Sequence, residues 1–153
     1  MTTYDFHLTA QWPGGRNGVG NIQCGELEIR TSIATAMGGP GVGTNPDELL
    51  LAAAGMCFFM TFAAFVERAG LMVDVMSLVS TMRVGTDPHG AYVCQKIIHR
   101  PRAVLATGAG AADLRRLDAL AEAAEQRCMI SAALRGNVEI LIEPDFTLAG
   151  PSQ

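Results

Sequence analysis

NPDELLLAAAGMCFFMTFAAFVER (Asn45–Arg68) is the stretch that decides the fold of this chain. Asn45 is a favourable helix N-cap and Pro46 suits the first helical position. The two carboxylates that follow complement the positive end of a helix dipole. Gly70 is a typical helix C-terminal stop. The pattern therefore predicts one long helix that runs to about Arg68.

The central part of this helix has no charged residue from Leu49 to Val66, a run of 18 residues. That length is the lower limit for a membrane span. However, Gly55, Cys57 and Thr61 interrupt the run, and no second span or basic flank accompanies it. A helix that is apolar all round is also typical of the centre of a large core or of a subunit interface. We therefore expect a buried helix and no membrane.

Alternating and β-branched segments lie on both sides of this helix. A second amphipathic helix is expected from near Ala112, with an apolar stripe that includes Cys128, and Gly136 ends that region. The expected order is βββ-α-ββ-α-β, an α+β domain with antiparallel sheets on two long helices that spans residues 1–153. The expected strands are Tyr4–Trp12, Val19–Gln23, Glu26–Ile33, Met72–Val84, Ala91–Leu105 and Val138–Ile142.

The composition excludes several classes of protein. The chain has 153 residues, of which 49% are hydrophobic and 17% charged, so a disordered chain is excluded. The net charge is −4 and no basic run occurs, so we expect no nucleic-acid partner. The N-terminus lacks the basic and apolar regions of a secretory signal. Four cysteines in such a chain indicate functional thiols in a cytoplasmic protein rather than a disulfide framework.

Two of these cysteines lie in the expected helices. Cys57 is inside the uncharged helix and Cys128 is on the apolar stripe of the second helix, so a close approach of the two is reasonable. Four cysteines allow three complete pairings, and each thiol can equally be a small buried hydrophobe. We interpret Cys24 and Cys94 as residues of a turn and a strand. The sequence contains no CxxC pair and no histidine spaced for a metal, so we expect no metal site.

Two longer motifs carry a resemblance to a known family. The segments GGPGVGTNPDELLLAAAGMCFF (Gly38–Phe59) and EQRCMISAALRGNVEI (Glu125–Ile140) resemble the OsmC/Ohr family of thiol-dependent organic hydroperoxide reductases, and the glycine run is closer to the OsmC side. The resemblance implies the OsmC-like fold and an intertwined homodimer with active sites at the subunit interface. It also implies an organic hydroperoxide substrate, a dithiol reductant such as dihydrolipoamide or a lipoylated protein, and no metal, flavin or haem.

The resemblance further implies a role for four residues. Cys57 matches the peroxidatic thiol, and Cys128 matches the thiol that resolves it to a disulfide. Arg16, in GGRNG, matches the arginine that activates the thiolate. Asp47 stands where the family has a glutamate that holds this arginine, and it is one methylene shorter. Met129 is a second departure, because the Ohr branch typically has proline after the resolving cysteine.

General chemistry agrees with these roles. Burial raises the pKa of a thiol, so a reactive Cys57 needs a nearby cation, and Arg16 is the natural supplier. An apolar wall would favour organic peroxides over hydrogen peroxide, although ordinary core packing explains the same residues equally well; the candidates are Met56, Phe58, Phe59 and Met60. Asp47 and Cys57 would lie about 15 Å apart along a continuous helix. Either the helix breaks near Gly55, or two subunits share the site.

We expect a peroxidase in which Cys57 attacks the peroxide and is oxidised to a sulfenic acid, which then condenses with Cys128. One alternative is an OsmC-like stress protein with weak or no peroxidase activity that acts as a thiol sensor or binding module. Another is a structural stress protein with inert cysteines, and the most remote is a membrane protein.

Overall fold

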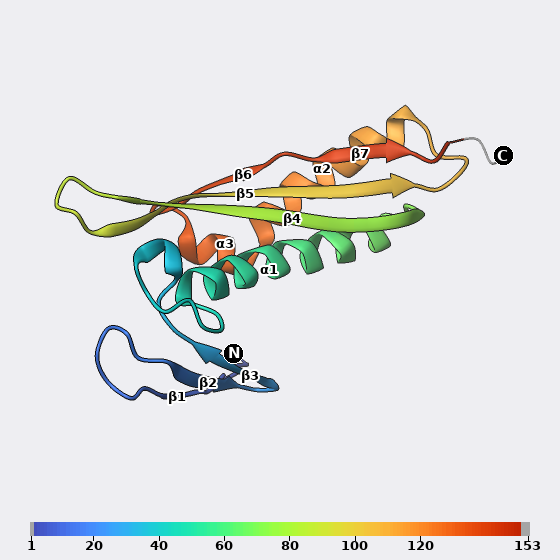
Figure 1. Cartoon of the computed structure of the whole chain (residues 1–153). Coiled ribbons are helices and arrows are strands. Elements are labelled where there is room, and N and C mark those ends of the chain that lie inside the picture. The colour runs from blue at the N-terminus through green and yellow to red at the C-terminus, as the bar shows by residue number, and fades with distance from the viewer. Residues whose placement is uncertain (1, 151–153) are drawn as a thin grey trace. The chain divides into compact units, whose positions relative to one another are not determined.

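The computed structural model describes residues 2–150, which form two compact units, residues 2–50 and 51–150. In this described part of the chain, seven strands and three α-helices make up an α+β fold (Figure 1). The elements are β1 (Leu8–Gln11), β2 (Gly20–Cys24), β3 (Leu27–Thr31), the short 3-10 helix η1 (Thr35–Met37), α1 (Pro46–Arg68), β4 (Val73–Thr86), β5 (Tyr92–Leu105), α2 (Ala111–Arg127), α3 (Met129–Leu134), β6 (Glu139–Ile142) and β7 (Asp145–Leu148). The expectation of a single domain over residues 1–153 stays a prediction.

The N-terminal unit is an antiparallel sheet in the order β1–β2–β3, followed by the glycine-rich loop. This loop folds back on β3, where the Ser32 hydroxyl donates to the Val42 carbonyl and accepts from the Val42 N–H at 2.9 and 2.7 Å. Gly43 has a positive φ, and a Cβ there would lie 2.0 Å from the Arg30 carbonyl oxygen. The glycine run is therefore required by close backbone packing.

α1 begins and ends where the sequence predicts. The Asn45 side-chain oxygen accepts the Glu48 N–H at 2.9 Å, which is N-capping. At the other end, Gly70 has a φ of +67° and donates to Glu67, while Leu71 donates to Val66. These two bonds form a Schellman motif. The helix is continuous over 23 residues, so the possible break near Gly55 does not occur.

The second sheet is mixed, which corrects the expectation of antiparallel sheets. β4 and β5 form a long antiparallel hairpin, but β6 and β7 both pair with β5 in parallel (Figure 1). β6 pairs with Lys96–His99 and β7 with Arg102–Leu105. The chain returns to β6 through α2 and α3, and such a helical crossover is what a parallel pair requires.

The second helical region is interrupted at Cys128, whereas the sequence predicts one helix as far as Gly136. Cys128 has extended dihedral angles (φ −65°, ψ 122°), so it ends α2 and precedes α3. The Cys128 sulfur accepts the Ser131 N–H at 3.4 Å and thereby caps α3. The break therefore gives the Cys128 side chain a fixed direction at a helix junction.

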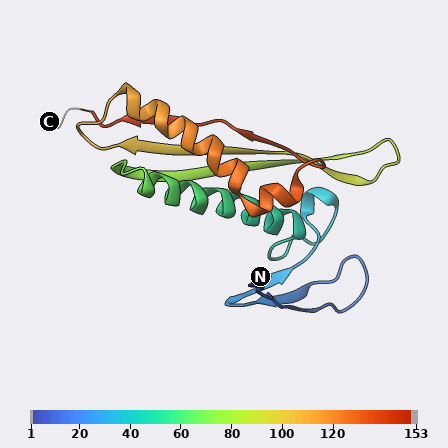
Figure 2. The same ribbon diagram turned by 180° about the vertical axis from the view of Figure 1, so that it is seen from behind.

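α1 and α2 lie on the same face of the mixed sheet, as Figure 2 shows. This confirms the α+β class with two long helices. The buried residues of this core are Phe58, Phe62, Val66, Ala103, Leu105, Leu117, Ala121, Ala124 and Cys128. By length and composition α1 could cross a membrane, but one of its faces packs into this core. On its outer face Met56 and Met60 are 52% and 66% exposed.

Candidate functional site

Cys57 and Cys128 lie together in the unit formed by residues 51–150. Cys57 is at the middle of α1, and Cys128 is at the junction of α2 and α3. Both thiols are free, and they lie close enough for each to shift the pKa of the other. Of the three pairings that the sequence left open, this is the one that the fold brings into contact.

The surroundings affect the two thiols in opposite ways. Burial and the hydrogen bond to Cys128 raise the pKa of Cys57, although the main-chain N–H groups of Ile130 and Met129 act in the other direction. Burial also raises the pKa of Cys128, but hydrogen bonds from Cys57, Ser131 and Ile130 outweigh it and lower that pKa overall. The surroundings therefore favour the thiolate form at Cys128 more than at Cys57.

The two thiols also differ in access to solvent. Cys128 is completely buried, whereas Cys57 is partly exposed. An incoming substrate can therefore reach Cys57 first. The pair combines one accessible sulfur with one protected sulfur, as a reaction through an internal disulfide requires.

Phe58 belongs to the core, which corrects its assignment to a substrate wall. Its side chain is fully buried and stacks on His99, with ring centroids 4.9 Å apart. The other three candidates are more open: Phe59 is partly buried, and Met56 and Met60 are exposed. The exposed apolar side chains among these candidates are therefore Met56 and Met60, one turn apart on α1.

His99 has no role predicted from the sequence, and the structure buries it in the core against Phe58 of α1. His99 Nδ1 lies 2.7 Å from the Ser80 hydroxyl oxygen on the neighbouring strand, and burial lowers the pKa of His99 to about 4. Its Nε2 is buried without a hydrogen-bond partner. Strand alternation was the available signal, because Ile97, His99 and Pro101 share the inward face of β5. The neutral imidazole is therefore a structural part of this core, held between Phe58 and Ser80.

Arg16 and Asp47 belong to the N-terminal unit. The Arg16 guanidinium donates to the main-chain carbonyls of Gly38 at 2.9 Å and Met37 at 2.5 Å. Among residues 2–150, the Asp47 carboxylate has no hydrogen-bond or ion-pair partner, so the expected Arg16–Asp47 pair is not formed. Its neighbour Glu48 accepts a bond from the Thr44 hydroxyl at 2.9 Å. The Arg16 guanidinium is therefore hydrogen-bonded to the two carbonyls at the end of η1. Asp47 lies in the first turn of α1.

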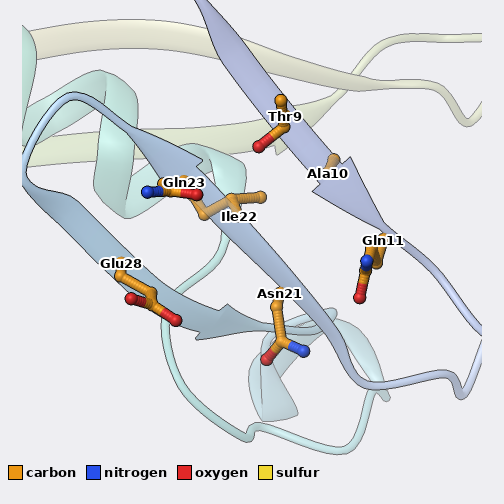
Figure 3. A pocket seen from close by; sticks show the side chains of 7 residues that line it. All are labelled: Thr9, Ala10, Gln11, Asn21, Ile22, Gln23 and Glu28. Carbon is orange, nitrogen blue, oxygen red and sulfur yellow. The ribbon is translucent and has the colours of Figure 1, made fainter.

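A polar hollow of about 410 Å³ lies on the N-terminal sheet (Figure 3). The residues that line it are Thr9, Ala10, Gln11, Asn21, Ile22, Gln23 and Glu28. None of them is a thiol or an imidazole, so this hollow offers no nucleophile of the kind found at Cys57. Within the described part of the chain, no group of three or more His, Cys, Asp or Glu side chains is arranged to hold a metal.

Comparison with known proteins identifies the family. The family model described as OsmC-like protein matches residues 38–143. The chain belongs to the OsmC-like family. Cys57 and Cys128 of this OsmC-like protein fall inside the matched segment, whereas Arg16 precedes it.

Relatives of this OsmC-like protein cover nearly its whole length. The uncharacterized protein YmaD of Bacillus subtilis is 44% identical over 150 residues, which is 98% of this chain and 99% of that protein. An organic hydroperoxide resistance protein of Xanthomonas axonopodis pv. citri is 28% identical over 141 residues, 91% and 92% of the two chains. The solved structure of an OsmC-like protein of unknown function from Vibrio cholerae matches with a TM-score of 0.78 at 16% identity, over 93% of this chain and 99% of that one. This last similarity shows the OsmC-like fold alone.

Proposed function

We propose that this OsmC-like protein is a thiol-dependent peroxidase that reduces organic hydroperoxides to alcohols. The observation that carries the proposal is the close approach of a partly exposed Cys57 and a buried Cys128. The organic hydroperoxide resistance protein of Xanthomonas, at 28% identity, supports the same chemistry.

The reaction has two steps. The Cys57 thiolate attacks the distal oxygen of the hydroperoxide, the O–O bond breaks, and the alkoxide leaves and takes a proton to give the alcohol. Cys57 is then a sulfenic acid. The Cys128 thiolate attacks its sulfur, hydroxide leaves and is protonated to water, and a Cys57–Cys128 disulfide forms. The Ser131 and Ile130 groups that lower the pKa of Cys128 favour the thiolate that this second step needs.

The first step requires a cation near Cys57, because burial and Cys128 both raise the pKa of Cys57. Arg16 is the proposed cation, and Asp47 the residue that holds it when the site is assembled. Since α1 has no break, a site shared between two subunits of a homodimer is the proposed arrangement. The exposed Met56 and Met60 on α1 support an apolar surface for substrate and subunit contact.

The proposed reductant is a dithiol, dihydrolipoamide or a lipoylated protein, in the cytoplasm. The apolar residues beside Cys57 support an organic substrate over hydrogen peroxide. No cofactor is required, because Cys57 gives two electrons to the peroxide directly and the dithiol returns them by disulfide exchange.

The test is mass spectrometry of the reduced protein after one equivalent of cumene hydroperoxide, with hydrogen peroxide in parallel. The proposal expects a rapid loss of about two mass units, mapped to Cys57–Cys128 and faster with the organic peroxide. Equally slow oxidation of all four cysteines would contradict it. Light scattering in the same buffer tests the homodimer, which a monomer would contradict.

A second candidate is an OsmC-like protein with weak peroxidase activity that acts as a thiol sensor or binding module. The unpaired Asp47 and the carbonyl-bound Arg16 favour it, because Cys57 then lacks activation. The variant Asp47→Glu separates the two functions. A large gain in turnover with the longer side chain would favour the sensor, and an unchanged turnover would favour the peroxidase.

A further inference from the structure

Ser131 is a buried residue whose hydroxyl has no hydrogen bond of ordinary geometry to another group. Its main-chain N–H donates to the Cys128 sulfur at 3.4 Å. The Ser131 side chain also contributes to the lowered pKa of Cys128. A buried hydroxyl without a partner is unfavourable, and an anionic sulfur beside it would remove that penalty.

We infer that Ser131 is a catalytic residue of the reductive step, which stabilises Cys128 as the leaving thiolate when a dithiol attacks Cys57 of the disulfide. This inference rests on the disulfide chemistry proposed above. It assigns Ser131 a role that neither Arg16 nor Asp47 can fill, because those residues serve Cys57 in the oxidative step.

The burial of the two sulfurs selects the point of attack. Cys57 is partly exposed and Cys128 is completely buried, so an external thiolate reaches Cys57. Thiol–disulfide exchange is faster when the sulfur that leaves is the better thiolate. Solvent access and leaving-group quality therefore both favour attack at Cys57 with Cys128 as the leaving thiolate.

The electrons balance without a further reactant. A thiolate of the dithiol forms a bond to Cys57 Sγ, the Cys57–Cys128 bond breaks, and its electron pair passes to Cys128 Sγ. The second thiolate of the dithiol then attacks the reductant sulfur of this mixed disulfide and releases Cys57 as a thiolate. The dithiol becomes a cyclic disulfide after losing two electrons and two protons. The protein gains the electrons and takes up protons as the pH requires.

The first test measures the ionisation of Cys128 by thiolate absorbance against pH, in a chain where Cys57, Cys24 and Cys94 are serine. Adding Ser131→Ala is expected to raise the midpoint by about one pH unit, because a hydrogen bond to a charged group is lost. Ser80→Ala is the matched control, since it removes a hydroxyl that bonds to His99 and should leave the midpoint unchanged. An unchanged midpoint in Ser131→Ala would overturn the inference.

The second test keeps all four cysteines and makes the Cys57–Cys128 disulfide with diamide, so it does not depend on peroxide reduction. An excess of a monothiol, 2-mercaptoethanol, is added, the reaction is quenched with acid, and the mixed disulfide is mapped. The adduct is expected on Cys57, and Ser131→Ala should slow its formation several-fold at pH 7 while Ser80→Ala does not. An adduct on Cys128, or equal rates in the two variants, would overturn the inference. A chain that passes both tests but does not reduce peroxide would contradict only the proposed function.

Discussion

The two units of this chain bury their apolar residues to very different extents. Residues 51–150 form an apolar core between α1, α2 and the mixed sheet. Its fully buried members include Phe58, Leu117 and Cys128. In residues 2–50 only Ile22 among the hydrophobic side chains is buried. The large exposed side chains of that unit are Tyr4, Phe6, Leu8, Trp12 and Leu27. The unit with the thiols therefore has a closed apolar core, whereas the N-terminal sheet lacks one of its own.

This contrast indicates a division of roles between the two units. The thiols need a fixed geometry, and a dense core supplies it. The N-terminal sheet offers apolar side chains to a further surface, which the proposed homodimer would supply. Substitutions in the two units should therefore affect activity and the free energy of unfolding differently.

The largest effect is expected from Cys57→Ser. Peroxide reduction should fall by at least about a thousandfold, because a serine hydroxyl is not ionised at neutral pH. The thermal midpoint should change little, since the partly exposed Cys57 and serine are nearly the same size. The measurement is turnover with cumene hydroperoxide, with Cys24→Ser as the control that keeps full turnover. Substantial residual activity in Cys57→Ser would show that Cys57 is not the thiol that attacks the peroxide.

Next in size is Phe58→Ala against Phe6→Ala. Phe58 is fully buried and stacked on His99, so its removal should cost about 3–5 kcal/mol of unfolding free energy. Phe6 is 87% exposed, and its removal should cost under about 0.5 kcal/mol if the chain is a monomer. Urea unfolding at two protein concentrations measures both effects. A loss in Phe6→Ala that depends on protein concentration would show that a second copy covers the N-terminal sheet.

A pH-dependent loss of stability is expected from His99. Burial lowers its folded-state pKa to about 4, below the ordinary value of 6.5. The unfolded chain therefore binds the proton more readily, and stability should fall as the pH drops from about 6.5 to 4, by at most about 3 kcal/mol. Urea unfolding at several pH values measures this loss. His99→Phe should flatten the profile in that range, and His89→Gln, in the exposed hairpin turn, should leave it as it is. A profile of His99→Phe parallel to the parent would assign the pH dependence to other groups.

The sequence predicts the parts of the fold that local signals control. The ends of α1 follow from Asn45, Pro46 and Gly70, because capping depends on neighbouring residues. The parallel pairing of β6 and β7 with β5 was missed, since strand pairing depends on residues distant in sequence. The break at Cys128 was missed too, because the apolar stripe continues through it without a glycine or proline.

The candidate site divides in the same way. Cys57 and Cys128 were selected by motif and lie in contact. The Arg16–Asp47 pair was also taken from a motif, but in the structure main-chain carbonyls hold the guanidinium. A motif cannot show which of several oxygen acceptors a flexible arginine selects. Ser131 lay within a quoted motif, yet its relation to Cys128 depends on the helix break that local signals do not show.

The smallest expected effect concerns Asn45, which caps α1 from the N-terminal side. Asn45→Ala removes the bond to the Glu48 N–H and should reduce the free energy of unfolding by about 1 kcal/mol. Asn137→Ala is the matched control, because that exposed side chain makes no such bond and its loss should stay within about 0.5 kcal/mol. Urea unfolding compares the two variants. Equal losses would mean that the Thr44–Glu48 bond and the first-turn carboxylates hold the start of α1 without the cap. A larger loss in Asn45→Ala, with the rate of Cys57–Cys128 disulfide formation unchanged, would show that the start of α1 contributes stability while the core alone fixes the geometry of the thiols.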